Sequence, residues 1–254
     1  MSLFILLLCL FTDIVLHKGM SRVILPKLFT DKISAQKFSR CAQPLKNNGK
    51  KWVKAVNTLQ RIKQLNMDAP GFEMDVYFDT VKNYLEVYHD SSEHGYPKIE
   101  EILKVYKERK LSSSIWLDFK NLSAENEKKS LSYILFLREE YHLQNKLIIE
   151  SALPQYLQSF CDSGFFTSYY VPFFNPYQLT ENELLQTIDT IAFNLKKYPV
   201  AALSGYYFQY PFLKKFFPDY PVLTWSQKSN YSLVSNIFNW LLLNDERTAI
   251  VLYQ

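Results

Sequence analysis

Short strand-like segments alternate with longer amphipathic segments from residue 38 onward, and this alternation constrains the fold more than any other feature of the chain. Such alternation is typical of βα units built around a parallel sheet. The expected strands lie at about 38–42, 71–78, 113–120, 146–151, 165–172, 201–208, 221–225 and 248–253. Eight strands within about 220 residues predict a single-domain (β/α)8 TIM barrel.

Helices are expected between these strands, at about 50–65, 97–109, 124–141, 180–197 and 230–243, with another starting near Pro154 and a short aromatic segment at 211–217. The helix at 180–197 opens with Thr180 and Glu183, a capping-box pattern. The chain ends at Gln254, within or just after the eighth strand, so the eighth helix is missing. Residues 21–37 are apolar enough, with Val23, Ile24, Leu25, Leu28 and Phe29, to cover the gap between strands eight and one.

Composition places the chain among ordinary globular proteins. Of the 254 residues, 48% are hydrophobic and 21% charged, which excludes a disordered chain. The net charge of +4 is modest and no nucleic-acid-binding motif is present, so nucleic acid is not an expected partner. The three cysteines, Cys9, Cys41 and Cys161, are odd in number and widely spaced, so they indicate neither a disulfide framework nor a metal cluster.

The N-terminal run LFILLLCLFT at residues 3–12 is apolar but shorter than a typical membrane span, and Asp13 follows it. No basic residue precedes the run and no A-x-A cleavage pattern follows it. Residues 1–19 are therefore interpreted as an uncleaved anchor or export signal, and residues 20–254 as the barrel. A start codon placed too early, before Met20, would give the same pattern. The interpretation predicts a membrane-anchored or exported protein.

The stretch from Gly71 to Asp90 combines a strand pattern with acidic residues. In a strand, Glu73 and Asp75 share one face with Tyr77, while Phe72, Met74 and Val76 share the other and are expected to face the helices. Carboxylates two residues apart lie about 6.5–7 Å apart along a strand, so both can reach one hard cation. The alternative is a solvated polar strand face with no ligand.

Further polar residues fall where other strands end, which is where barrel enzymes hold their active sites. They are Arg40, His89, Asp118, Lys120 and Glu150. Together with Glu73 and Asp75, the carboxylate of Asp118 provides the oxygen ligands that Mg²⁺ or Ca²⁺ prefers. A lysine beside such a cation can neutralise a phosphate. The pattern therefore predicts a metal-dependent phosphodiester site.

The segments FEMDVYF, LEVYHD and IWLDFKNL resemble the glycerophosphodiester phosphodiesterase superfamily of PLC-like phosphodiesterases, whose fold is such a barrel. They are more similar to a divergent branch that includes menorin-like proteins and the spider-toxin phospholipase D enzymes. The resemblance implies that Glu73, Asp75 and Asp118 bind the metal and Lys120 holds phosphate. It also implies that His89 acts as acid or base, and Trp225 matches the family's aromatic residue on strand seven and is a possible substrate contact. From their positions at strand ends, Arg40 is expected to have a catalytic role in neutralising phosphate charge and Glu150 to contact the substrate.

One position departs from this pattern. The family carries a histidine on strand one, and Ser39, in SRCAQPL, takes its place in the predicted alignment. A serine cannot accept a proton near neutral pH as imidazole does. His94, in the loop after the return segment, is expected to be a surface residue.

Two hypotheses follow from this departure. The first is a weakly active hydrolase of a glycerophosphodiester or a phospholipid-like substrate. The second is a catalytically silent barrel that binds metal and a phosphate head group.

Overall fold

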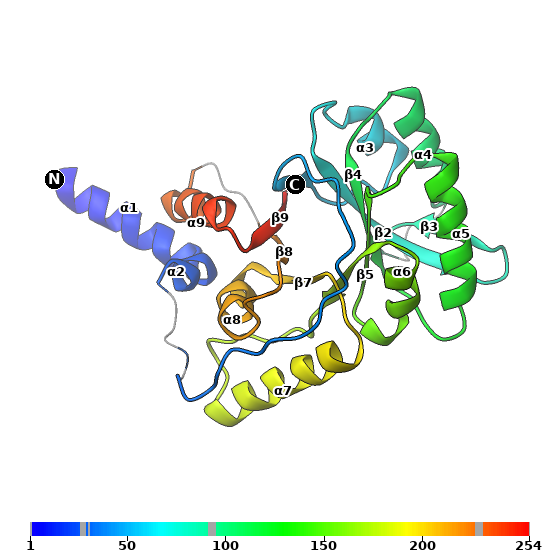
Figure 1. The fold of residues 1–254 in the computed structure, drawn as a ribbon. Coiled ribbons are helices and arrows are strands. Elements are labelled where there is room, and N and C mark those ends of the chain that lie inside the picture. The colour runs from blue at the N-terminus through cyan, green and yellow to red at the C-terminus, as the bar shows by residue number, and fades with distance from the viewer. Residues whose placement is uncertain (1, 26–28, 30, 91–94, 227–230, 254) are drawn as a thin grey trace.

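The computed structural model describes residues 2–25, 29, 31–90, 95–226 and 231–253 (Figure 1). Its centre is a barrel of eight parallel strands, closed because β1 (Lys51–Val53) pairs with both β2 (Gly71–Asp79) and β9 (Thr248–Tyr253). The remaining barrel strands are β4 (Ser114–Phe119), β5 (Leu147–Ser151), β6 (Phe166–Tyr170), β7 (Ala202–Tyr206) and β8 (Val222–Trp225). A return strand, β3 (Tyr84–Val87), pairs antiparallel with β2. The predicted single-domain TIM barrel is confirmed.

Helices surround the barrel much as the periodicity predicts. They are α3 (Leu59–Gln64), α4 (Ile99–Glu108), α5 (Glu127–Glu140), α6 (Gln158–Asp162), α7 (Glu181–Lys197), α8 (Tyr210–Phe216) and α9 (Leu233–Asn244), with 3-10 turns η1 (Pro154–Tyr156) and η2 (Tyr207–Gln209). The predicted capping box forms at α7, where the Thr180 hydroxyl accepts a hydrogen bond from the Glu183 amide. β9 ends at Tyr253, the last described residue.

The barrel strands separate two apolar layers. Outside, Phe72, Met74 and Val76 of β2 are fully buried in a core shared with the helices, as predicted. Inside, a smaller cluster centred on Trp52 and Trp116 fills the barrel. Gly71 makes room for this filling, because a Cβ there would lie only 2.3 Å from the Trp52 ring. Two buried indole side chains therefore occupy the interior of the barrel.

The first strand lies elsewhere than predicted. Residues 38–42 form no strand but run across the amino-terminal end of the barrel, where the Cys41 amide donates to the Val200 carbonyl. The true first strand, β1, lies inside the predicted helix 50–65. That prediction was wrong because Trp52 and Val53 belong to a three-residue strand, and only Leu59–Gln64, capped by the Thr58 hydroxyl, is helical.

A disulfide joins Cys41 to Cys161 across 120 residues of sequence. It ties the segment that crosses the barrel end to α6, and it corrects the expectation that the cysteines do not pair. Cys9 is free and exposed. A hydrogen bond also joins these two segments, because the Gln43 side-chain amide donates to the Cys161 carbonyl at 3.0 Å.

The N-terminal residues form α1 (Ser2–Leu16) and α2 (Lys18–Ile24), and α1 projects away from the barrel (Figure 1). Val23, Ile24 and Phe29 do not cover the sheet between β9 and β1 but line an apolar groove of about 550 Å³ with α8 and α9. Leu28, part of the same prediction, lies outside the described residues. No single described helix is long and apolar enough to cross a membrane; α1 and α2 reach that length only as a pair bent by 94°.

Candidate active site

Acidic residues on three neighbouring parallel strands lie side by side, because the strands pair in register. Asp75 on β2 is the register partner of Asp118 on β4, which in turn is the partner of Glu150 on β5. All three face a cavity of about 150 Å³ at the carboxyl ends of the strands. The cavity is lined by Lys54, Glu73, Asp75, His89, Trp116, Asp118, Lys120, Glu150, Tyr170, Tyr206, Trp225 and Leu252.

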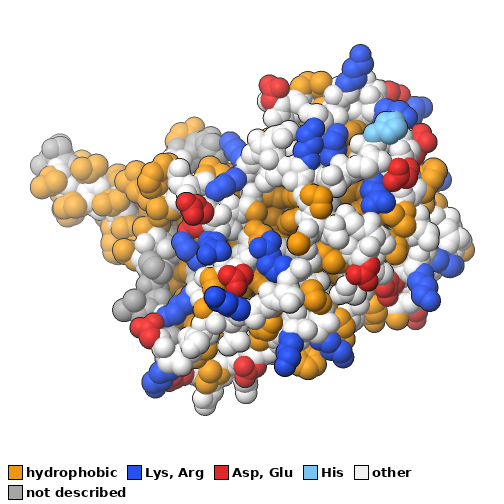
Figure 2. All heavy atoms as spheres, in the orientation of Figure 1, with side chains coloured by type: hydrophobic (Ala, Val, Ile, Leu, Met, Phe, Trp, Pro, Cys, Tyr) orange, Lys and Arg blue, Asp and Glu red, His pale blue; other side chains and the backbone are white. Residues whose placement is uncertain are grey.

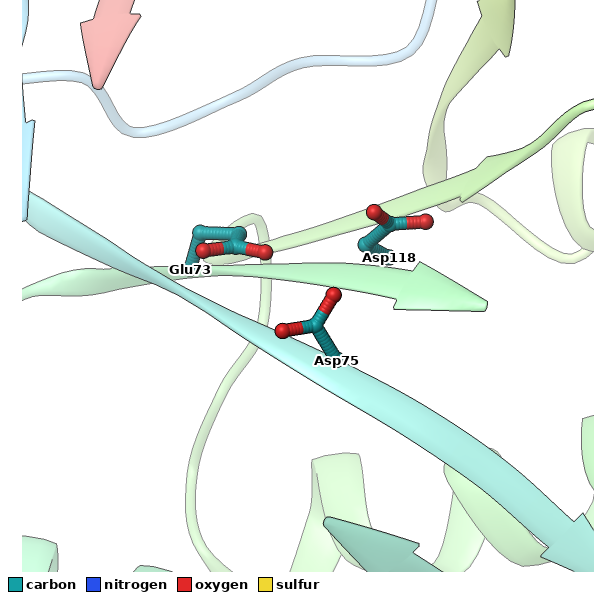
Figure 3. Close-up of side chains that lie close together, drawn as sticks. All are labelled: Glu73, Asp75 and Asp118. Carbon is teal, nitrogen blue, oxygen red and sulfur yellow. The ribbon is translucent and has the colours of Figure 1, made fainter. Parts of the chain in front are cut away.

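Glu73, Asp75 and Asp118 form the centre of this site. Their carboxyl groups lie close together on β2 and β4 (Figure 3), and one oxygen from each lies within 4.8 Å of the others. Glu73 and Asp75 are only 3% and 2% exposed. Burial of several carboxylates in one place is costly unless a cation or hydrogen bonds compensate. The donor set, all hard oxygens, fits Mg²⁺ or Ca²⁺.

The segment that follows β1 holds two of these carboxylates in place. The Ala55 amide donates to Glu73 Oε2 at 2.5 Å, and the Asn57 side chain donates to Asp75 Oδ2 at 2.6 Å. In return, the Asp75 amide donates to Asn57 Oδ1 at 3.0 Å. Ala55 adopts a left-handed backbone (φ 56°), which costs a residue other than glycine about 1–2 kcal/mol. A strained, closely bonded turn of this kind is typical of a functional site.

Lys120 is the cation closest to the triad. Its ammonium lies 2.7 Å from Asp75 Oδ1 and also contacts Asp118 Oδ2, while its side chain is 25% exposed. Burial alone would lower the pKa of Lys120, but the adjacent carboxylates of Asp118 and Asp75 outweigh it and raise that pKa. Lys120 therefore stays charged and compensates part of the acidic cluster. The structure thus places Lys120 beside the candidate metal ligands Asp75 and Asp118, as predicted.

Burial raises the pKa of three carboxyl groups in the site, those of Glu73, Asp118 and Glu150. The pKa of Glu73 rises to about 8, first because the group is buried and second because Asp75 lies beside it. Burial also raises the pKa values of Asp118 and Glu150. One oxygen of Glu150 is buried and has no hydrogen-bond partner among the described residues. Such perturbed groups in a cleft are characteristic of functional sites.

Two residues predicted for the site lie elsewhere. Arg40 donates to the backbone carbonyls of Asp219 and Ala201, which precede β8 and β7, so it lies at the opposite end of the barrel. Ser39 lies beside it and does not occupy a strand-one position in the site. Both were misplaced with the first strand. His94 lies outside the described residues.

His89 does reach the site, at its rim. It lines the cavity, yet its side chain is 62% exposed, and Nδ1 lies 3.1 Å from Asp90 Oδ1. A histidine in this position is accessible to solvent and to a ligand that enters the cavity. The structure thus places His89 on the same cavity as the acidic cluster, as predicted, although its ion-pair partner is Asp90 and not one of the three clustered carboxylates.

The far wall of the cavity is aromatic. Tyr170, Tyr206 and Trp225 come from β6, β7 and β8, and their rings meet edge to face, with the centroids of Tyr206 and Trp225 4.8 Å apart. Lys54, just after β1, extends its ammonium to 5.8 Å from the centroid of the Trp225 ring. Among the described residues that line the cavity, Lys54 is the cation that forms no ion pair.

Sequence reasoning missed Lys54, Asn57, Tyr170 and Tyr206. Tyr170 and Tyr206 lie within two residues of the ends of the predicted strands 165–172 and 201–208, and they end the observed strands β6 and β7, so the rule that located Glu150 could have found them. Lys54 and Asn57 could not, because they lay inside a segment predicted to be helical.

No family model matches the chain, and no curated protein matches it in sequence. Solved structures do match in fold. A protein from Silicibacter pomeroyi, assigned as a glycerophosphoryl diester phosphodiesterase, is 11% identical with a TM-score of 0.57, covering 83% of this chain and 91% of its own. A glycerophosphodiester phosphodiesterase from Parabacteroides distasonis is 15% identical, with a TM-score of 0.54 and coverages of 82% and 93%.

A third match is an Oleispira antarctica phosphodiesterase, solved in complex with the product sn-glycerol-3-phosphate. It is 12% identical, with a TM-score of 0.52, and the alignment covers 80% of this chain and 92% of that one. At these identities the likeness concerns the fold. The chain therefore has the barrel fold of the glycerophosphodiester phosphodiesterases, as the sequence motifs predicted.

Proposed function

We propose that this protein is a metal-dependent phosphodiester hydrolase that acts on a glycerophosphodiester or a phospholipid-like substrate. The observation that carries the proposal is the cluster of Glu73, Asp75 and Asp118, with one oxygen of each within 4.8 Å of the others at the carboxyl end of the barrel. The shared fold with glycerophosphodiester phosphodiesterases supports it. A purely structural role does not explain three carboxylates buried close together, because neutral side chains of similar size would stabilise the fold better.

Glu73, Asp75 and Asp118 would hold one Mg²⁺ or Ca²⁺ ion. Such an ion supplies charge stabilisation to a phosphoryl oxygen when it is bound. Asn57 orients Asp75, and the Ala55 amide orients Glu73, so both carboxylates are held before a ligand arrives. Preorganisation of this kind strengthens metal affinity, and the loss of an orienting partner typically lowers it about 10–100-fold.

Lys54 is assigned to the substrate phosphate. An acidic cavity repels an anion unless positive charge remains available. Lys120 is already shared between Asp75 and Asp118, whereas Lys54 forms no ion pair within the described part of the cavity. Lys54 also follows strand one, the strand on which the resemblance expects a histidine. A lysine there binds phosphate as a point charge but is a poor proton acceptor at neutral pH.

His89 is the remaining candidate for proton transfer. It lies at the cavity rim, and imidazole is the side chain suited to accept or donate a proton near neutral pH. With one imidazole instead of two, turnover is expected to be slow, since one positioned acid or base contributes about 10²–10⁴ in rate. The aromatic wall of Tyr170, Tyr206 and Trp225 would contact the organic part of the substrate, opposite the acidic strands.

The test is hydrolysis of soluble glycerophosphodiesters and of phospholipids by purified protein with Mg²⁺ or Ca²⁺. Asp75→Asn should abolish turnover, and Asp68→Asn, the same change at an exposed position far from the cavity, should leave it intact. Lys54→His restores an imidazole on strand one and should raise kcat in a manner that depends on His89 and on metal. Turnover that survives both Asp75→Asn and metal chelation would exclude the proposed site.

A second candidate function is a catalytically silent barrel that binds metal and a phosphate head group. Lys54 at the end of strand one favours it, because a lysine can retain phosphate without transferring protons. This candidate predicts metal-dependent binding of sn-glycerol-3-phosphate with no turnover, and no gain of turnover in Lys54→His. The two functions are separated by the same set of variants.

A further inference from the structure

Helix α1 exposes apolar side chains on every side. The eight consecutive residues from Leu3 to Leu10 are all exposed, and all are apolar. Because successive residues of a helix are rotated by about 100°, eight of them cover the full circumference more than twice. Figure 2 shows the hydrophobic side chains along the segment that projects from the molecule. A helix that is apolar all round requires an apolar environment all round.

The base of α1 is bonded to the barrel. Asp13, the acid that follows the apolar run, accepts a hydrogen bond from the Val234 amide at 3.0 Å, at the start of α9. His17 lies 3.0 Å from Asp13 and 3.2 Å from the hydroxyl of Ser232, the N-cap of α9. Asp13 thus caps α9 and fixes the direction in which α1 leaves the barrel.

The outer face of α9 continues this apolar surface. Leu233, Ile237, Trp240 and Leu241 are exposed at positions i, i+4, i+7 and i+8, which form one stripe of a helix. Trp240 is 63% exposed. Tryptophan is enriched where a protein meets the boundary between lipid and water. Lys18, the exposed first residue of α2, adds positive charge suited to lipid head groups.

We infer that a lipid bilayer covers this surface, with α1 embedded in the hydrocarbon and the outer face of α9 resting at the head groups. A protein partner with one groove would cover one side of α1, whereas lipid covers all of them. The two helices are adjacent, because Asp13 of α1 accepts a hydrogen bond from the Val234 amide of α9. The bilayer is therefore the occupant that matches both the all-round apolar helix and the one-sided stripe beside it.

The docking surface adjoins the mouth of the barrel. Tyr206 lines the site, and the next residue, Tyr207, packs so closely on α2 that a Cβ at Gly19 would lie 2.5 Å from its hydroxyl oxygen. The start of α9 follows β8, whose last residue, Trp225, also lines the site. A bound bilayer would thus lie beside the site, which favours a bilayer phospholipid over a soluble diester as substrate. This consequence, unlike the docking itself, rests on the proposed hydrolase function.

Flotation of the full-length protein with vesicles tests the docking without reference to catalysis. Protein mixed with phosphatidylcholine vesicles, with and without phosphatidylserine, should float with both and more strongly with the anionic lipid. The double variant Ile237→Ser and Trp240→Ser should reduce the partition coefficient about tenfold, from the loss of two apolar contacts with lipid. The matched control is Phe193→Ser, which removes an exposed aromatic residue from α7 and should change nothing.

The result that overturns the inference is wild-type protein that stays in the aqueous fraction with both kinds of vesicle. Equal flotation of the α9 double variant and the wild type overturns the assigned surface. A mature protein that lacks residues 2–16, measured by mass spectrometry of the expressed chain, also overturns it. Circular dichroism of each variant verifies folding. Flotation without hydrolysis would contradict the proposed function and leave the docking intact, so the two can fail separately.

Discussion

Metal binding should release a proton from Glu73, and the amount is set by its burial. The pKa of this carboxyl is raised to about 8 in the metal-free protein, so at pH 7 about nine molecules in ten carry the proton. A cation binds the ionised form and displaces that proton. About 0.9 proton or more should leave per metal ion at pH 7 and about 0.1 from this group at pH 9. Apparent affinity should rise about tenfold per pH unit below 8 and then level off.

The raised pKa of Glu73 should also make the free energy of unfolding depend on pH. A carboxyl whose folded pKa lies above its ordinary value contributes stability that is complete below that ordinary value, near 4.5, and lost as pH rises through 8. The free energy of unfolding of metal-free protein should therefore fall as pH rises through this window, and added Mg²⁺ or Ca²⁺ should restore it. Burial of Asp118 and Glu150 acts in the same direction.

Calorimetric titration in two buffers of different ionisation enthalpy measures the protons released. Glu73→Gln should remove the part of the release that titrates near pH 8, because the amide holds no acidic proton. Metal binding at pH 7 without proton release would refute the assignment of Glu73 as a buried, protonated ligand. So would an affinity that stays constant between pH 6 and 8.

Three further variants test contacts that hold the barrel and the site together. Asn57→Ala removes two hydrogen bonds to Asp75 and should lower metal affinity about 10–100-fold, measured by calorimetry; an unchanged affinity would mean that Asp75 needs no support. Replacing both Cys41 and Cys161 by serine opens a 120-residue loop and should lower the free energy of unfolding by about 2–5 kcal/mol in denaturant titration. Gly71→Ala should cost about 1–3 kcal/mol through its clash with Trp52, seen as a lower thermal midpoint.

The acidic cluster could be predicted from sequence because two simple periodicities determine it. Alternation along β2 places Glu73 and Asp75 on the face opposite Met74, and parallel pairing aligns residues near the ends of adjacent strands. Asp118 and Glu150 then fall at the level of Asp75, as the register confirms. The closed barrel follows from the same count of strands.

The strand-one side of the site could not be predicted, for a physical reason. β1 has only three residues, Lys51–Val53, too few to show a period. Ala55, two residues beyond it, adopts a left-handed conformation that local propensity disfavours for alanine, and tertiary contacts to Glu73 stabilise it. Because the strand was predicted at 38–42 and lies at Lys51–Val53, Arg40 was assigned to the site and Lys54 was overlooked. The Cys41 to Cys161 pairing depends on the same tertiary path across the barrel end.

The location of a bound cation tests the central claim most directly. Anomalous X-ray scattering from crystals soaked in Mn²⁺, used in place of Mg²⁺, should show a peak within about 2–2.6 Å of an oxygen from each of Glu73, Asp75 and Asp118. Lys120 should then lie farther from Asp75 than its present 2.7 Å, because the two cations compete for one carboxylate. Diffraction that shows no peak among these oxygens, with Lys120 still in contact with Asp75, would contradict a metal-dependent phosphodiester site in this barrel.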